Sequence, residues 1–193
     1  MNSFALPLGA LLCCAPLLAS VAAPTQADRV TSEIRRTEVG ERILVHELEL
    51  EASVEEVWKA YTTDAGWMAW AAPAAAVDLR VGGTIRTAYE GVTLGEEGTN
   101  TLHILNYVPR EVLTLKADIG ANWPEVLKQD GERLSNVILF DELGSERTRV
   151  RSYGIGYGDS AEYEELLQFF LRANEGLLKG LKRYVETGER TDW

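Results

Sequence analysis

The feature that most constrains the fold is a long apolar stripe near the end of the chain. From Tyr163 to Tyr184 apolar residues recur at spacings of three and four, and the pattern continues to about Gly188. This spacing predicts one long helix that buries a single face. We expect Asp159, with Glu162 three residues later, to cap its first turn. The stripe consists of Tyr163, Leu166, Leu167, Phe170, Leu171, Asn174, Leu177, Leu178, Leu181 and Tyr184.

The segments before this helix have the alternation of β-strands. In "RILVHELEL", Leu44, His46, Leu48 and Leu50 share one face, which predicts a strand buried on that side. "TNTLHILNYV" and "EVLTLKADI" predict two further strands, and "SNVILFDEL" and "RTRVRSYGIGY" a hairpin turning at "GSE". In "VDLRVGGTIRTAYEG", Gly82 and Gly83 separate two short strand-like runs. An antiparallel sheet must therefore cover the long helix.

A shorter helix is predicted after the first of these strands. Ser53 and Glu56 have the spacing of a capping box, and Val54, Val57, Trp58 and Tyr61 follow at helical spacing. Trp58 lies on the buried face of this helix, so we assign it to the core. "AGWMAWAAPAAA" then predicts a second short helix or turn. The element order is typical of an α+β domain, in which the terminal helix lies across a curved antiparallel sheet.

The N-terminal segment is interpreted as a signal peptide. Residues 1–27 contain no charged side chain, and Ser20-Val21-Ala22 form a small-x-small cleavage site. An uncleaved membrane anchor is the alternative, because the apolar run approaches the ~20 residues of a spanning helix. We expect residues 1–22 to be the signal peptide, 23–39 a polar lead-in and 40–190 a single domain, located in the periplasm or secreted.

Composition restricts the chemistry of the mature domain. Both cysteines, Cys13 and Cys14, lie within the expected signal peptide, which excludes disulfides and thiolate metal sites after cleavage. The net charge of −11 disfavours nucleic acid and anionic membranes as partners. Neither HExxH nor GxSxG occurs, and His46 and His103 are far apart in sequence. We therefore expect no metal and no cofactor, and we assign no catalytic residue.

Four segments carry a family resemblance. "ASVEEVWKAYTTDAGWMAW", "VDLRVGGTIR", "TRVRSYGIGYGD" and "LKRYVETG" occur in this order, and the likeness covers about residues 43–188. They resemble the homologues of the activator of the ninety-kilodalton heat-shock protein ATPase, a family of the START-like (SRPBCC, birch-pollen-allergen) superfamily. Ser53 replaces the usual Pro, Tyr61 the usual Leu, and Gly154 a larger residue. The signal peptide, unusual in this family, argues against a cytosolic chaperone partner.

The resemblance implies a helix-grip fold with a cavity between the sheet and the terminal helix. Members of the superfamily hold lipids, steroids, polyketides or other apolar molecules there. We expect Trp67 and Trp70 at the cavity mouth, Trp123 at the opposite lip, and empty volume beside Gly154. Asn174, a polar residue in an apolar row, needs a partner there. The predicted ligand-binding residues are Trp67, Trp70, Tyr89, Tyr107, Trp123, Leu166, Phe170 and Asn174.

These expectations leave three functions open. The first is an exported domain, not an enzyme, that binds a small hydrophobic or amphipathic molecule. The second is an enzyme of cyclase, isomerase or hydratase type, with His46, His103 or a buried carboxylate as general base. The third is a protein-interaction module with a collapsed cavity and an unidentified partner. The cavity and its lining distinguish these functions.

Overall fold

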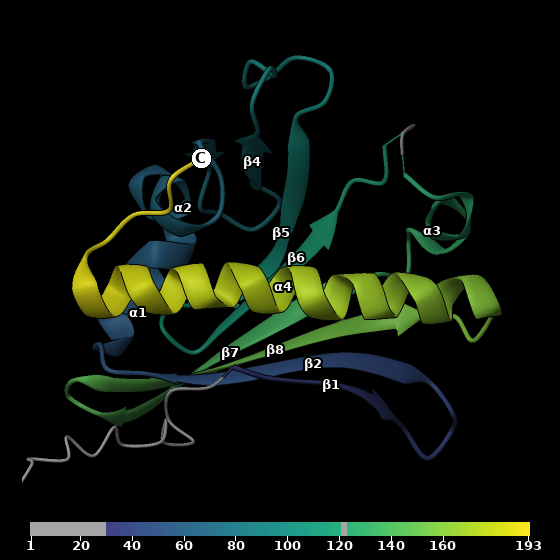
Figure 1. Ribbon diagram of the computed structural model, residues 1–193, viewed down its shortest axis with the longest axis horizontal. Coiled ribbons are helices and arrows are strands. Elements are labelled where there is room, and N and C mark those ends of the chain that lie inside the picture. The colour runs from purple at the N-terminus through teal and green to yellow at the C-terminus, as the bar shows by residue number, and fades with distance from the viewer. Residues whose placement is uncertain (1–29, 121–122) are drawn as a thin grey trace, which may run out of the picture.

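The computed structural model describes residues 30–120 and 123–193. The expected signal peptide and the cysteine pair lie outside the described residues. The chain folds as an eight-stranded antiparallel sheet that holds a long C-terminal helix against its concave face (Figure 1), which confirms the α+β helix-grip prediction. None of the described helices combines the length and apolar character needed to cross a bilayer.

The strands lie in the order β1-β2-β8-β7-β6-β5-β4-β3, so β2 pairs with a strand far along the chain. Leu44, His46 and Leu48 of β2 lie opposite Gly154, Ser152 and Val150 of β8. The strands are β1 (Thr31–Arg36), β2 (Arg42–Leu50), β3 (Ala74–Val77), β4 (Thr84–Ala88), β5 (Asn100–Val108), β6 (Val112–Ala117), β7 (Ser135–Gly144) and β8 (Arg147–Tyr157). The helices are α1 (Val54–Thr62), α2 (Asp64–Trp70), α3 (Glu125–Asp130) and α4 (Ala161–Thr187).

Strand β1 lies within the segment expected to be a polar lead-in. Residues 31–36 pair antiparallel with β2 at the edge of the sheet. The strand is hard to recognise in the sequence because Ile34 is its only apolar residue. Charged and polar side chains suit an edge position, where they oppose pairing with another chain.

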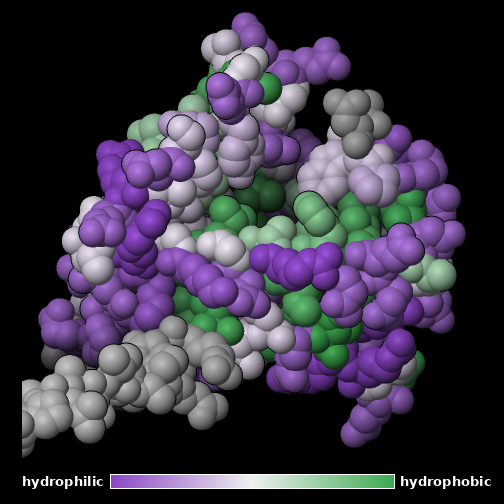
Figure 2. All heavy atoms as spheres, in the orientation of Figure 1, coloured by the Kyte–Doolittle hydropathy of each residue, from purple (hydrophilic) through white to green (hydrophobic). Residues whose placement is uncertain are grey.

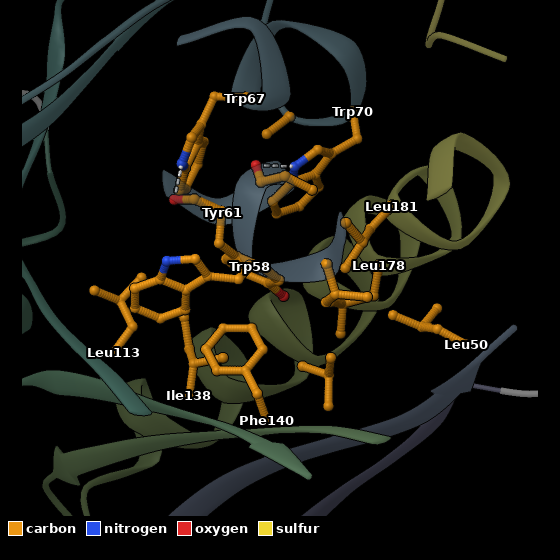
Figure 3. Close-up of a cluster of buried hydrophobic side chains, with 14 of the residues drawn as sticks. Leu50, Trp58, Tyr61, Trp67, Trp70, Leu113, Ile138, Phe140, Leu178 and Leu181 are labelled. Atoms are coloured by element: carbon orange, nitrogen blue, oxygen red, sulfur yellow. Dashed lines mark hydrogen bonds between the residues drawn. The ribbon is translucent and has the colours of Figure 1, made fainter. Parts of the chain in front are cut away.

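The two short helices after β2 carry most of the aromatic core. The capping box between Ser53 and Glu56 is present at the start of α1. Trp58 is buried, as predicted, and its ring packs edge-on against Phe140 of β7 at 5.4 Å between centroids. Thr63 ends α1 and begins α2, where its hydroxyl accepts a hydrogen bond from the Gly66 amide. Figure 3 shows this cluster between the two helices, the sheet and α4.

Helix α4 begins one residue later than predicted. Ser160, not Asp159, is its N-cap, and the Asp159 carbonyl instead accepts a hydrogen bond from Arg42 at 2.6 Å. Arg42 also pairs with Glu164 of α4 at 2.9 Å, so the buried guanidinium of β2 fixes the start of the helix. The helix ends at Gly188, which adopts the left-handed conformation of a C-cap.

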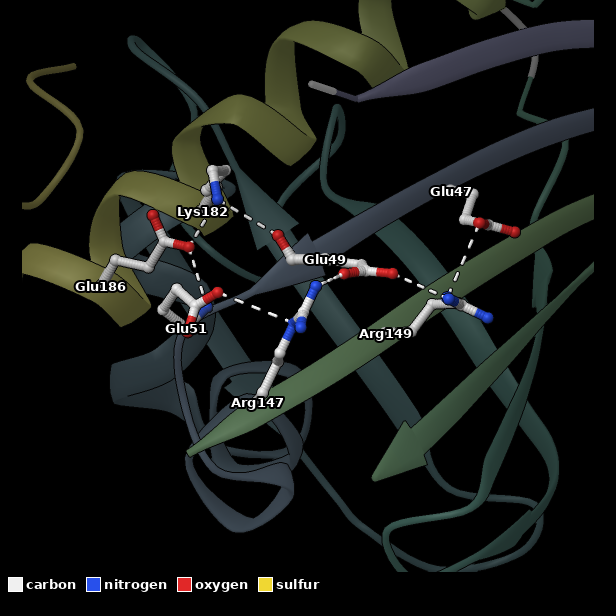
Figure 4. Close-up of polar contacts among 7 residues, drawn as sticks. All are labelled: Glu47, Glu49, Glu51, Arg147, Arg149, Lys182 and Glu186. Carbon is white, nitrogen blue, oxygen red and sulfur yellow. Dashed lines mark hydrogen bonds and ion pairs between the residues drawn. The ribbon is translucent and has the colours of Figure 1, made fainter. Parts of the chain in front are cut away.

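A network of charged residues fixes the other half of α4 (Figure 4). Lys182 donates to the Glu49 carbonyl at 3.1 Å, and Glu186 accepts from the backbone amide that follows β2. The Glu49 carboxylate accepts hydrogen bonds from Arg149 and Arg147 of β8, which lower its pKa. The helix is thus held to β2 near both ends, and its central turns lie over the concave face.

Candidate functional site

A cavity of about 560 Å³ lies between the concave face of the sheet and α4. Strands β2 and β4 to β8 and all four helices contribute to its lining. Figure 2 shows hydrophobic side chains inside the recess above α4, within a mostly hydrophilic surface. Volumes of this size are typical of pockets for small molecules.

The inner end of the cavity is aromatic. Trp67 and Trp70 line it but are 8% and 4% exposed, so they form a buried wall and not the mouth. The Trp67 indole N–H donates to the Tyr61 carbonyl at 2.6 Å, and that of Trp70 to the Ala60 carbonyl at 3.0 Å. Both indole donors are therefore satisfied by α1, and the cavity meets the carbon surfaces of the rings.

A band of polar side chains crosses the middle of the cavity. Leu44, Gly154 and Asn136 are aligned across β2, β8 and β7, and His46, Ser152 and Ile138 form the next row. The Ser152 hydroxyl donates to the side-chain oxygen Oδ1 of Asn136 at 2.9 Å.

Asn174 of α4 also lines the cavity. Its half-buried side chain makes no hydrogen bond to any described residue, so its amide is available to a molecule in the cavity. A molecule in the cavity can supply the partner that the sequence analysis expected for this residue.

His46 is the titratable group nearest the centre of this band. Its Nε2 lies 3.1 Å from the carbonyl oxygen of Leu171 in α4 and acts as the donor. Burial lowers its pKa below the ordinary value, against a smaller opposing effect of the Leu171 hydrogen bond and of Glu175. The ring is therefore neutral near pH 7 and carries its lone pair on Nδ1.

The outer end of the cavity lies between α3 and the first half of α4. The rings of Trp123 and Phe170 lie 6.3 Å apart there. The space beside Gly154, expected to be empty, is filled, because a Cβ on Gly154 would lie 3.0 Å from the Tyr157 hydroxyl oxygen. Burial raises the pKa of the Tyr157 hydroxyl to about 12, so this side chain remains an uncharged phenol.

Exposed aromatic residues also contribute to the lining. Phe169 is 56% exposed and belongs to the lining. Tyr89 donates to the Ala71 carbonyl at 3.0 Å, and its ring packs edge-on against Trp193. The segment after α4 reaches this position because the Thr191 amide donates to the Ala69 carbonyl at 2.8 Å.

A second recess of about 700 Å³ lies beside β5, β6 and α3. It contains His103, whose Nε2 is 2.7 Å from the Asp118 carboxylate, and the Lys116–Glu132 ion pair. Its third basic residue, Lys128, pairs with Glu125 of α3, and the described residues include no group of three metal-ligating side chains. Asp118 borders both recesses, whereas His103 lines only this one.

The family model described as Activator of Hsp90 ATPase homolog 1-like protein matches residues 51–186. This chain belongs to that family. The resemblance found in the sequence is therefore confirmed, and the START-like fold with it. No curated protein sequence matches the chain.

Solved structures share the fold of this Activator of Hsp90 ATPase homolog 1-like (AHSA1-like) domain. The Aha1 dimer from Colwellia psychrerythraea superposes with a TM-score of 0.59 at 18% identity, covering 76% of this chain and 97% of that one. CalU16 from Micromonospora echinospora gives 0.58 at 20% identity, covering 84% and 86%. A conserved protein of unknown function, EF2215 from Enterococcus faecalis, gives 0.57 at 15%, covering 83% and 80%.

Six of the eight predicted ligand-binding residues line the cavity of the AHSA1-like domain: Trp67, Trp70, Tyr89, Trp123, Phe170 and Asn174. Tyr107 does not: it faces inward opposite Leu113, but it packs against Trp58 in the core and not at the cavity. Leu166 does not: it packs against the buried cluster of Leu127, Leu134 and Tyr163, as Phe170 does, but it does not reach the cavity.

Sequence reasoning did not select several residues that the AHSA1-like fold brings to the cavity. His46, Asn136 and Ser152 come from three strands, and their proximity depends on strand pairing that the sequence does not specify. The alternation of residues in β2 predicts that His46 lies on the inner face, and this is the one signal in the sequence that points to a residue of this group.

Proposed function

We propose that this AHSA1-like domain binds a small hydrophobic or amphipathic molecule in the cavity beneath α4. The observation that carries the proposal is a cavity of about 560 Å³ with an aromatic inner end and a few polar groups. Each 100 Å² of apolar ligand surface buried there contributes roughly 2.5 kcal/mol. Part of this gain offsets the loss of ligand motion on binding. A cavity of this volume also argues against the interaction module with a collapsed interior.

Native mass spectrometry tests the proposal directly. The purified domain is measured before and after organic extraction, and the extracted protein is titrated with a panel of fatty acids and aromatic compounds by tryptophan fluorescence. We expect a co-purified species or saturable quenching, because Trp67 and Trp70 form the inner wall. Absence of both would refute the proposal.

A cavity-filling variant adds a structural control. Ala173 of α4 lines the cavity, so Ala173→Trp places an indole in the space available to a ligand. Ala161→Trp makes the same change at an exposed position of the same helix. We expect Ala173→Trp to lower affinity at least about tenfold and Ala161→Trp to leave it unchanged, as overpacking a site excludes its ligand. Equal affinities in the two variants would place binding elsewhere.

An enzyme acting on a hydrophobic substrate is the second candidate, because His46 lines the cavity. Its Nε2 is held by Leu171, so Nδ1 is the atom able to accept a proton. Turnover that is lost in His46→Gln, while ligand affinity is retained, would establish this activity. Binding of the same compounds without turnover would favour the binding domain.

We also propose that the domain acts in the periplasm or is secreted. The support is the uncharged N-terminal segment of residues 1–27 with its small-x-small site. Expression of the full chain in a Gram-negative host, followed by fractionation and N-terminal sequencing, tests this. Recovery of an uncleaved chain from the cytoplasm would contradict it.

A further inference from the structure

We infer that the cavity selects uncharged ligands whose hydrogen-bonding group lies part-way along an apolar body, and that it rejects carboxylates and phosphates. This inference rests on the proposed function, because it concerns the molecule that occupies the same cavity. It is carried by two features of the lining, namely the kind of charges present and the position of the polar band.

The lining offers no positive partner for an anion. Among the described residues that line the cavity there is no Lys and no Arg. The one carboxylate, Asp118, lies at the border with the second recess and is already paired with His103 at 2.7 Å. His46 is neutral near pH 7 because it is buried. A ligand carboxylate would lose its hydration without gaining a counter-ion, and the domain's net charge of −11 would repel it.

A cluster of polar groups lies part-way along the cavity, on the floor formed by the sheet, and Thr87, Asn100 and Thr101 add polar atoms elsewhere in the lining. Asn136 and Ser152 occupy adjacent rows of the sheet, and His46 pairs with Ser152 in the second of these rows. The aromatic wall formed with α2 lies on one side of these rows, and the Trp123–Phe170 pair lies on the other. A fatty acid or detergent has its polar group at one end, whereas this lining suits a ring system substituted near its centre.

The side-chain amides without a hydrogen-bond partner favour a ligand that carries a hydroxyl or a carbonyl. The Asn174 amide can donate and accept, and no described residue hydrogen-bonds it. Asn136 accepts from Ser152 through its oxygen, which leaves its amide nitrogen without a partner in the described chain. A hydroxyl between these side chains can accept from one and donate to the other. A carbonyl can accept from both.

Anthracene derivatives provide a matched set of probes. In 9-anthracenemethanol the hydroxyl is central, in 2-anthracenemethanol it is terminal, in 9-anthracenecarboxylate the central group is anionic, and 9-methylanthracene has no polar group. Affinities are measured by fluorescence titration of the purified domain at pH 7.5. We expect the central alcohol to bind about fivefold more tightly than the terminal alcohol or the hydrocarbon. The carboxylate should bind at least about 100-fold more weakly than the central alcohol.

Two variants test whether the polar band causes the preference for an uncharged ligand with a central hydroxyl. Asn174→Leu should remove the roughly fivefold advantage of 9-anthracenemethanol over 9-methylanthracene, since it removes the amide without adding charge. Asn174→Lys should strengthen binding of the carboxylate by about tenfold or more, since it supplies the missing cation. Arg172→Leu, at an exposed position of the same helix, is the control and should change neither ratio.

The outcomes separate this inference from the proposed function. If the carboxylate binds within about tenfold of the central alcohol, the inference is overturned while the binding function stands. If the two alcohols and the hydrocarbon bind equally, the ligand hydroxyl gains nothing from the polar band, and the inference is again overturned. If none of the four probes binds, the inference is overturned, and the native mass spectrometry and ligand panel decide separately whether the binding function stands.

Discussion

Substitution of Gly156 by alanine provides a sharp test of how the cavity wall is built. Gly156 lies near the end of β8 and has a φ of +92°, in the region that favours glycine. A Cβ at this position would lie 2.1 Å from the Arg133 carbonyl oxygen, far inside any ordinary contact. The close approach holds the segment between α3 and β7 against β8, and that segment contributes Leu134 to the cavity.

The expected loss of stability has two parts, and alanine variants at other glycines serve as controls for them. A left-handed φ costs an L-residue about 1–2 kcal/mol, and overpacking costs about 1–3 kcal/mol more. Gly40 has a φ of +85° but nothing within 4 Å of its Cβ position, so Gly40→Ala measures the first part alone. Gly176 lies in α4 with open space and no positive φ, so Gly176→Ala should stabilise the domain by up to about 1 kcal/mol.

Urea denaturation of the three variants and the wild type measures the free energy of unfolding. We expect Gly156→Ala to lose about 3 kcal/mol or more, equivalent to a Tm lower by roughly 10 °C. Gly40→Ala should lose only about 1–2 kcal/mol, and Gly176→Ala should be at least as stable as the wild type. The reasoning is refuted if Gly156→Ala is no less stable than Gly40→Ala, because the contact with Arg133 would then impose no cost.

Two further predictions concern the buried polar contacts. Trp70→Phe removes the donor to the Ala60 carbonyl at the end of α1, so we expect a loss of about 2–3 kcal/mol in urea, against about 0.5 kcal/mol or less for the exposed Trp193→Phe. His46 has a lowered pKa in the folded protein, so the unfolded chain, with a histidine pKa of about 6.5, binds more protons as the pH falls. The stability due to neutral His46 is therefore complete above about pH 6.5 and declines below it, and His46→Gln should flatten the pH dependence of the unfolding free energy between about pH 7 and 5. Equal losses in the two tryptophan variants, or parallel pH profiles for wild type and His46→Gln, would contradict these two accounts.

Local sequence patterns correctly predict the helices and strands whose buried residues recur at a regular spacing. The alternation across Leu44 to Leu50 and the Ser53–Glu56 spacing describe β2 and the start of α1 correctly. Strand β1 was not recognised because Ile34 alone provides its apolar signal, and a polar edge strand has no period to detect.

Residues of the candidate site were harder to predict because they depend on contacts between distant segments. Tyr107 faces inward but packs against Trp58 in the core and not at the cavity, and nothing in its own neighbourhood in the sequence marks that contact. Leu166 and Phe170 belong to one helical stripe and both pack against Leu127, Leu134 and Tyr163, yet Phe170 lines the cavity and Leu166 does not. The space beside Gly154 is filled by Tyr157, which depends on how one side chain turns back toward its own strand.

The order of strands in the sheet has a consequence for how the domain reaches its native state. Glu49 and Arg147, which meet where β2 lies beside β8, are 98 residues apart in the sequence. Closing so long a loop is entropically costly, and sheets dominated by such distant pairings fold slowly. Helix α4 follows β8, so the concave face cannot be covered until every strand of the sheet has been synthesised. During that interval the aromatic wall faces water, and an apolar compound that partitions onto it would be enclosed by the last helix to arrive.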